Sequence, residues 1–193
     1  MESEGVSYET ASDKAKILKD IFASKSNIDD KGKVPPLCPN LANKSINNIK
    51  IRAKVIKQKL LLLHLKAAKA TGPDGIPARV LWKCASALSK PLSSLFSLSL
   101  SKGIVPTEWK CANVVPIYKA DGKSNPNNYR PISLLPIISK VMESLINDRL
   151  REHLFGLNLI SNHQYGFRPK HSTLICLHTV LKIGKMPLIK VKK

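Results

Sequence analysis

Residues 71–77 constrain this chain more than any other segment, because two glycines and two prolines in seven positions stop a helix or strand from running through them. Glycine reaches backbone angles that other residues avoid, whereas proline fixes φ and removes a backbone N–H donor. The segment therefore predicts a tight loop whose shape depends on Gly72, Pro73, Asp74 and Gly75. We expect Asp74 to stabilise this loop through an Asx-type turn bond, which is a structural role.

Apolar residues recur at helical spacing on both sides of this loop. The spacing predicts helices over residues 11–25 (capped by Ser12), 44–66, 78–84, 89–101 (ended by Gly103), 136–155, and from Ser172 or Thr173 to about residue 182. The helix over 136–155 is amphipathic, with an apolar face that consists of Ile137, Val141, Leu145, Ile146 and Leu150.

Two short segments rich in β-branched residues, 112–118 and 129–134, predict strands. The residues between them, 119–128, hold Asp, Gly, Ser, Pro and three Asn, so they predict a connecting loop. Pro116 indicates that the first strand lies at an edge or near a bulge. A further short extended segment is expected at 163–168. The fold class is therefore α+β and helix-rich, with a small antiparallel sheet.

The chain divides into three parts on composition. Residues 1–42 are expected to form an N-terminal helix followed by a linker, because 26–42 contain Asn, Asp, Gly and three prolines. Residues 43–182 are expected to form the main domain. Residues 183–193 carry four lysines and no periodicity, so they predict a basic tail.

Charge is the first indication of a partner. The chain has 32 Lys and Arg against 13 Asp and Glu, which gives a net charge of +19. Such an excess repels itself unless polyanions or counterions offset it, and each phosphate contact releases condensed counterions. Nucleic acid is therefore the expected partner. The competing interpretation is a generic lysine-rich surface, or a fragment of a larger protein whose acidic part is missing.

Four cysteines, Cys38, Cys84, Cys111 and Cys176, are widely spaced and form no Cys-x-x-Cys pair. A zinc site needs close ligand pairs, so no zinc site is expected. We expect buried free thiols, which suit a reducing compartment.

The first residues are polar and acidic, so no signal peptide is expected. The longest apolar run, residues 60–65, contains a histidine and is too short to cross a bilayer. The chain is expected to be intracellular (cytoplasmic, nuclear or both), with no membrane partner and no secretion.

Four segments occur together in a characteristic order: 69–81 (KATGPDGIPARVL), 103–135 (which includes VVPIYK and NYRPISLL), 138–150 (ISKVMESLINDRL) and 159–173 (LISNHQYGFRPKHST). In this order and spacing they resemble the N-terminal half of the reverse transcriptase domain of jockey-like non-LTR retrotransposons. Residues 17–36 also resemble the segment that joins endonuclease to polymerase in such elements. The resemblance implies part of a right-hand polymerase fold, namely the fingers and the start of the palm.

The resemblance also implies contact residues. Lys119 matches a basic residue close to the incoming nucleotide, and Arg130 an arginine that contacts the triphosphate or the template-strand backbone. Gly166, Phe167 and Arg168 match a segment that contacts the template. Implied partners are an RNA template and a DNA primer. Two alternatives stay open: Arg130 can instead cap an acidic partner at a strand end, and Phe167 can instead be a core residue.

Nucleotide transfer needs divalent metal held by carboxylates, which is Mg²⁺ in the complete family domain. The resemblance places those aspartates after the last matched motif, whereas no Asp or Glu follows Glu152 in this chain. We therefore expect no catalytic residue, no cofactor and no polymerase activity from the chain alone, and a missing palm and thumb as its partner. Without the palm, the apolar faces of the sheet and of the 137–155 helix are expected to be exposed.

Two origins stay open, a decayed element copy or a partial gene model of a longer protein. The alternative function is a non-catalytic, basic nucleic-acid-binding protein derived from a retroelement.

Overall fold

The structure is a computed structural model that describes residues 2–3, 6–27, 31–34, 45–46, 49–63 and 70–184. Its contacts divide the chain into two units, one of residues 1–39 and 47–148, the other of residues 40–46 and 149–193. These units do not coincide with the expected domains 1–42, 43–182 and 183–193. The expected domain boundaries therefore remain predictions. The expected basic tail beyond residue 184 lies outside the described residues.

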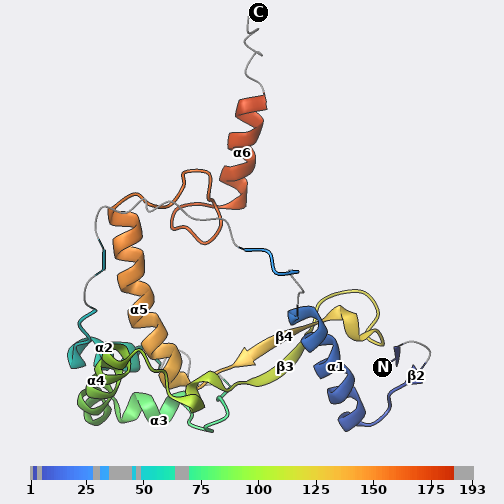
Figure 1. Cartoon of the computed structure of the whole chain (residues 1–193), viewed down its shortest axis with the longest axis horizontal. Helices are drawn as coiled ribbons and strands as arrows, with labels where there is room; N and C mark the ends of the chain where they lie inside the picture. Colours follow the sequence, from blue (N-terminus) through green and yellow to red (C-terminus); the bar gives the residue numbers. More distant parts are fainter. Residues whose placement is uncertain are drawn as a thin grey trace, which may run out of the picture. The chain divides into compact units, whose positions relative to one another are not determined.

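The elements follow one another along the chain as Figure 1 shows. They are β1 (Glu2–Ser3), β2 (Val6–Ser7), α1 (Ala11–Ser26), α2 (Ala53–Leu61), α3 (Ala78–Lys83), α4 (Ala85–Lys102), the 3-10 helix η2 (Thr107–Lys110), β3 (Asn113–Tyr118), the 3-10 helix η3 (Pro126–Asn128), β4 (Tyr129–Leu134), α5 (Ile137–Gly156) and α6 (Thr173–Gly184). Strands β1 and β2 pair with each other, and β3 pairs with β4, both antiparallel. The predicted helix-rich α+β class with a small antiparallel sheet is confirmed.

The core of the first unit lies among α2, α3, α4 and the first part of α5. Ile56, Leu60 and Phe96 are fully buried there. The α5 residues that pack against them are Ile137, Val141, Met142 and Leu145. The expectation that the apolar face of this helix is exposed was therefore wrong for its first turns, because α2 and α4 cover it. Burial of this kind stabilises by about 25 cal/mol per Å² of apolar surface.

Helix α1 begins at Ala11, as the predicted range 11–25 has it, but its cap differs from the prediction by two residues. Thr10, not Ser12, is its N-cap: the Thr10 Oγ1 accepts a hydrogen bond from the Asp13 N–H at 3.1 Å. The Thr10 hydroxyl also donates to Asp13 Oδ2 at 2.6 Å, so the cap and the first-turn acid hold each other.

Helix α2 is shorter than the predicted 44–66. Residues 49–52 are not helical, and the Ser93 hydroxyl of α4 donates to the Ile51 carbonyl oxygen at 3.0 Å. This tertiary bond holds the chain just before Arg52, the N-cap, whose backbone is extended, and the helix begins at Ala53. The expected end at residues 64–66 lies outside the described residues.

Helix α4 begins at Ala85, earlier than the predicted residue 89, and carries Pro91 inside it. It ends as predicted at Gly103, whose φ of 64° lies in the left-handed region. The N–H of Ile104 then donates to the Ser99 carbonyl oxygen at 3.1 Å, which satisfies one of the last free carbonyls of the helix.

The loop of residues 71–77 is held against the start of α5. A Cβ on Gly72 would lie 2.4 Å from the Pro136 nitrogen, so only glycine fits this backbone approach. The Gly75 N–H donates to the Gly72 carbonyl oxygen at 3.1 Å, and Gly75 has a φ of +63°. Asp74 Oδ1 accepts from the Ile76 N–H at 3.3 Å, which forms an Asx turn.

Strands β3 and β4 begin and end within one residue of the prediction. The Lys119 N–H donates to the Asn128 carbonyl oxygen at 2.8 Å, which identifies that pair as hydrogen-bonded. Because hydrogen-bonded pairs alternate with non-hydrogen-bonded ones, Pro116 and Pro131, which face each other, fall in a non-hydrogen-bonded pair. Neither proline therefore removes a ladder hydrogen bond.

In the second unit, α6 begins at Thr173 with Ser172 as its cap, because Ser172 Oγ accepts from the Ile175 N–H at 3.3 Å. The expected extended segment at 163–168 was wrong, since these residues form successive turns. None of the helices in the described part of the chain is both long and apolar enough to cross a membrane.

Candidate nucleic-acid interface

Lys119 and Arg130 come together on one face of the β3–β4 hairpin. Ile117 lies opposite Arg130 in the ladder, and Lys119 follows Ile117 by two residues. The backbone bond from Lys119 to Asn128 continues the same ladder by one pair. Side chains two apart on a strand, and directly opposite each other across strands, point to the same side of a sheet. The two cations are therefore diagonal neighbours at the loop end of this face.

The middle of this face is apolar and exposed. Val115 and Ile132 form the next hydrogen-bonded position of the ladder, and both are exposed, as is Ile117. The expected exposure of the apolar sheet face is confirmed. Sequence reasoning missed that this apolar surface adjoins Lys119 and Arg130, although the strand register would have revealed it. The site thus combines two neighbouring cationic side chains with exposed apolar ones.

Helix α1 lies against the opposite face of the hairpin, although Val114 on that face remains 53% exposed. Helix α1 contacts β4 and η3, and a hollow of about 270 Å³ lies between α1 and β3. Its lining residues are Ala15, Leu18, Lys19, Phe22, Val114 and Pro116. Helix α1 thus occupies one side of the sheet and leaves the Arg130 side open.

The loop that joins the strands is held by its own hydrogen bonds. The Asn128 side-chain amide donates to the Gly122 carbonyl oxygen at 2.9 Å, and the Tyr129 hydroxyl donates to the Lys123 carbonyl oxygen at 3.0 Å. Lys123 Nζ lies 5.7 Å from the centre of the Tyr118 ring, a cation–π contact. These bonds fix the chain direction just beyond Lys119, so the cation projects from an ordered turn.

Arg130 is exposed, and it forms no ion pair with any described residue. The alternative interpretation, in which Arg130 caps an acidic partner, therefore has no support within the described part of the chain. A guanidinium with five donors and no carboxylate nearby can bind an external phosphate through two parallel hydrogen bonds.

Gly166, Phe167 and Arg168 form a separate turn in the second unit. Phe167 has a φ of 58° and a fully exposed side chain. The interpretation of Phe167 as a core residue was therefore wrong. Arg168 Nη1 donates to the Ser161 carbonyl oxygen at 3.0 Å, which ties the two ends of the turn together. A bulky residue in the left-handed region is strained, and such strain is often kept where a side chain is presented for binding.

The acidic residues in the described part of the chain do not gather into a magnesium site. Among the described residues no three His, Cys, Asp or Glu side chains gather as metal ligands. Asp148 pairs with Lys59 at 2.7 Å, and Glu152 pairs with Arg149 at 2.6 Å. The donor set in this part of the chain therefore does not fit the two-metal centre of a polymerase.

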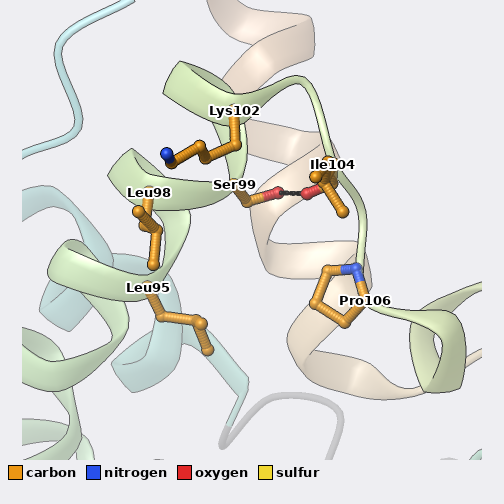
Figure 2. A pocket seen from close by; sticks show the side chains of 6 residues that line it. All are labelled: Leu95, Leu98, Ser99, Lys102, Ile104 and Pro106. Carbon is orange, nitrogen blue, oxygen red and sulfur yellow. Dashed lines mark hydrogen bonds between the residues drawn. The ribbon is translucent and has the colours of Figure 1, made fainter.

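A hollow of about 440 Å³ lies beside the end of α4 (Figure 2). Its lining residues are Leu95, Leu98, Ser99, Lys102, Ile104 and Pro106. The Ser99 hydroxyl already donates to the Ile104 carbonyl oxygen at 2.6 Å, drawn as a dashed line in Figure 2. With one cation and otherwise apolar walls, the hollow suits an apolar side chain better than a nucleotide.

Two of the cysteines contradict the expectation of buried thiols. Cys84 and Cys111 are exposed and Cys176 is half-buried, all three as free thiols. Cys84 lies between α3 and α4, where the chain turns at the surface. Cys38 lies outside the described residues.

Residues 117–189 match the family described as reverse transcriptase (RNA-dependent DNA polymerase). This segment begins at Ile117, opposite Arg130, and includes the turn at Phe167 and all of α6. Both candidate sites therefore lie within the matched part of the chain.

Proteins of mobile elements are similar to this chain. The RNA-directed DNA polymerase from mobile element jockey of Drosophila melanogaster is 35% identical over 128 residues, which are 65% of this chain and 14% of that protein. The protein of the same name from Drosophila funebris is 32% identical over 134 residues, 68% of this chain and 14% of that protein. The retrovirus-related Pol polyprotein from type-1 retrotransposable element R1 of Bradysia coprophila is 32% identical over 110 residues, 56% of this chain and 11% of that protein.

These matches confirm the resemblance to non-LTR retrotransposon reverse transcriptases over part of the chain. The aligned residues span at most 14% of the length of these relatives.

Proposed function

We propose that this chain, whose residues 117–189 match reverse transcriptases, supplies the fingers part of an RNA-directed DNA polymerase from a mobile element. In this role it contacts an RNA template, a DNA primer and the incoming nucleotide, and it works with a palm and thumb of the same polymerase. The observation that carries this proposal is the face of the β3–β4 hairpin on which Lys119 and Arg130 are neighbours.

Lys119 and Arg130 provide complementary ways to bind phosphate. The guanidinium of Arg130 forms a planar fork that matches two phosphate oxygens, whereas the ammonium of Lys119 is a compact point charge. The exposed apolar floor beside them, which includes Ile117 and Ile132, accepts the face of a base or sugar. Together they suit a nucleoside triphosphate or the backbone of a template strand.

The Gly166–Arg168 turn provides the second proposed contact. Its exposed aromatic ring at Phe167 can stack on an unpaired base, and base–aromatic stacking contributes about 1–3 kcal/mol per base. Arg168 holds the turn through its bond to Ser161 and adds positive charge beside the ring.

The same 193 residues are proposed not to extend a primer by themselves. The complete family domain uses Mg²⁺ to align the primer hydroxyl with the α-phosphate. The described acids do not gather into such a site, and no Asp or Glu follows Glu152 in the sequence. The proposed role of these residues is to bind and orient the template, the primer and the incoming nucleotide.

Primer extension on an RNA template tests both parts of the proposal. The purified chain is incubated with a labelled DNA primer, nucleotides and Mg²⁺ or Mn²⁺, beside an active reverse transcriptase, and binding of the same RNA is measured in parallel. Binding without extension is expected. Primer extension would overturn the proposed inactivity, and failure to bind RNA would overturn the proposed contacts.

A second function is a non-catalytic, basic nucleic-acid-binding protein derived from a retroelement. The observation that favours it is the ordered core of the first unit, which packs around the fully buried Phe96. It predicts a cooperative thermal unfolding transition and RNA binding that added nucleoside triphosphate leaves unchanged. If Lys119 and Arg130 serve the polymerase role, triphosphate competes with RNA at the hairpin.

A further inference from the structure

The segment around α2 carries positive charge without any neighbouring acid in the sequence. From Lys31 to Pro73 the chain has ten Lys and Arg and no Asp or Glu. Four of these cations are exposed side chains close to or on α2, and we call them the α2 cationic face: Lys50, Arg52, Lys54 and Lys57. None of the four forms an ion pair with a described residue.

These four exposed side chains follow one another within eight residues, at the start of α2 and just before it. Ile51 packs against the core, and its carbonyl oxygen is held by Ser93, so Lys50 and Arg52 on either side of it point outward. Within α2, Ile56 and Leu60 are fully buried. Lys54 lies on the side of the helix away from these residues, and Lys57 lies at the edge of the buried side, next to Leu60; both lysines are exposed.

The third lysine of α2, Lys59, forms an ion pair, in contrast to Lys54 and Lys57. Lys59 Nζ lies 2.7 Å from Asp148 Oδ2 and donates to Ser144 Oγ at 2.5 Å. Its charge is therefore neutralised by α5 within the unit. The α2 cationic face has no such partner among the residues that the structure describes, so its charges are available for an external polyanion.

We propose that the α2 cationic face binds the phosphate backbone of single-stranded RNA, as a contact separate from the β3–β4 hairpin. An anionic membrane is the less suitable partner, because Ile56 and Leu60 of α2 are buried against the core and a single exposed leucine, Leu61 at the last position of the helix, does not form an apolar stripe that inserts into lipid. Lysine and arginine on an ordered helix track a phosphate chain without reading its sequence. The inference goes beyond the proposed polymerase contacts and does not depend on them.

The salt dependence of RNA binding tests this assignment. A quadruple variant, Lys50→Gln with Arg52→Gln, Lys54→Gln and Lys57→Gln, is compared with the unchanged chain on an unstructured RNA. Each lost phosphate contact lowers the slope of log K against log salt by about 0.7, so we expect the slope to fall by about 2–3. Affinity near physiological salt is expected to fall at least about tenfold.

A matched control removes the same charge elsewhere. The control cations are exposed residues of other segments: Lys16, Lys25, Lys110 and Lys140. Their replacement by Gln is expected to change the slope by less than about one. Equal losses in the two variants would show a general charge effect, and no loss in the α2 variant would show that RNA does not use this face; either result overturns the assignment.

Two further measurements keep the inference testable even if the quadruple variant unfolds. Acetylation of the unchanged chain with and without RNA, read by mass spectrometry, is expected to show protection of Lys50, Lys54 and Lys57 but not of Lys16 and Lys25. Absence of that protection overturns the assignment. Binding to anionic vesicles and to polyglutamate is measured as well. If the affinity for either equals the affinity for RNA at equal charge, and the quadruple variant loses it, the assignment to RNA is also overturned. The Arg130→Ala variant, which tests the hairpin, is expected to retain the protection of α2, so the two contacts can fail separately.

Discussion

A Cβ added to Gly72 would lie 2.4 Å from the backbone nitrogen of Pro136, so the loop of residues 71–77 and the entry to α5 approach each other through a position that only glycine can fill. Because the colliding atoms belong to the backbone, a side chain cannot simply rotate away. Overpacking of this kind costs about 1–3 kcal/mol. We expect Gly72→Ala to lower the free energy of unfolding by that amount, measured by urea titration.

The control for this change is Gly122→Ala. A Cβ at Gly122 would meet only Ser124 Oγ at 3.7 Å, an ordinary contact, so stability is expected to change by less than about 0.5 kcal/mol. If Gly72→Ala proves as mild as Gly122→Ala, the close approach to Pro136 does not constrain the loop.

The pair Lys59–Asp148 is expected to couple α2 and α5 only weakly. Its atoms are 2.7 Å apart, but the Asp148 side chain is 54% exposed, so water screens the attraction. A double-mutant cycle with Lys59→Gln and Asp148→Asn should give a coupling energy of about 0.5 kcal/mol. The coupling should shrink in 1 M salt, where screening acts over about 3 Å. A salt-independent coupling of several kcal/mol would indicate a buried pair instead.

Arg130→Ala is expected to weaken RNA binding and to lower its salt slope by about 0.7, because one phosphate contact is lost. Arg130→Lys is the matched variant: it keeps the charge and the slope but loses the planar fork, so affinity falls while the slope stays. Fluorescence anisotropy at four salt concentrations distinguishes the two. Unchanged affinity and slope in both variants would remove Arg130 from the interface.

Phe167→Gly is expected to separate binding from stability. The ring is fully exposed and the residue has a φ of 58°, so glycine relieves strain without removing buried surface. The melting temperature should stay the same or rise, while RNA binding weakens by about 1–3 kcal/mol if the ring stacks on a base. A clear fall in melting temperature would mean that the ring packs against protein after all.

The sequence predicted best the elements whose determinants are local. Strands β3 and β4 were placed to within one residue, because β-branched runs flank a loop rich in Asn, Gly and Pro. Gly103 ended α4 as expected, since a positive φ at a helix end is a local property of glycine.

The errors arose where a distant contact or an unusual backbone angle decides. Helix α2 begins at Ala53 because Ser93, 42 residues further along the chain, holds the Ile51 carbonyl oxygen. The turn at Phe167 depends on a left-handed backbone conformation, which aromatic residues rarely adopt, so nothing in the sequence indicated it. For the candidate site, the resemblance indicated Lys119 and Arg130 as two separate contact residues and did not predict that they are neighbours. Their common face became evident only from the pairing of the two strands.

Pro116 and Pro131 face each other at the middle of the hairpin, and this pairing has a consequence for solubility. In a non-hydrogen-bonded pair the backbone nitrogens point away from the partner strand, and in proline those nitrogens carry no hydrogen. The outer edge of each strand therefore lacks a backbone N–H donor at its centre, so a strand of a neighbouring molecule cannot accept a hydrogen bond there. A row of uncovered valine and isoleucine would otherwise invite fibrous association. The hairpin can thus expose apolar side chains for a partner while its edges resist pairing with strands of other copies.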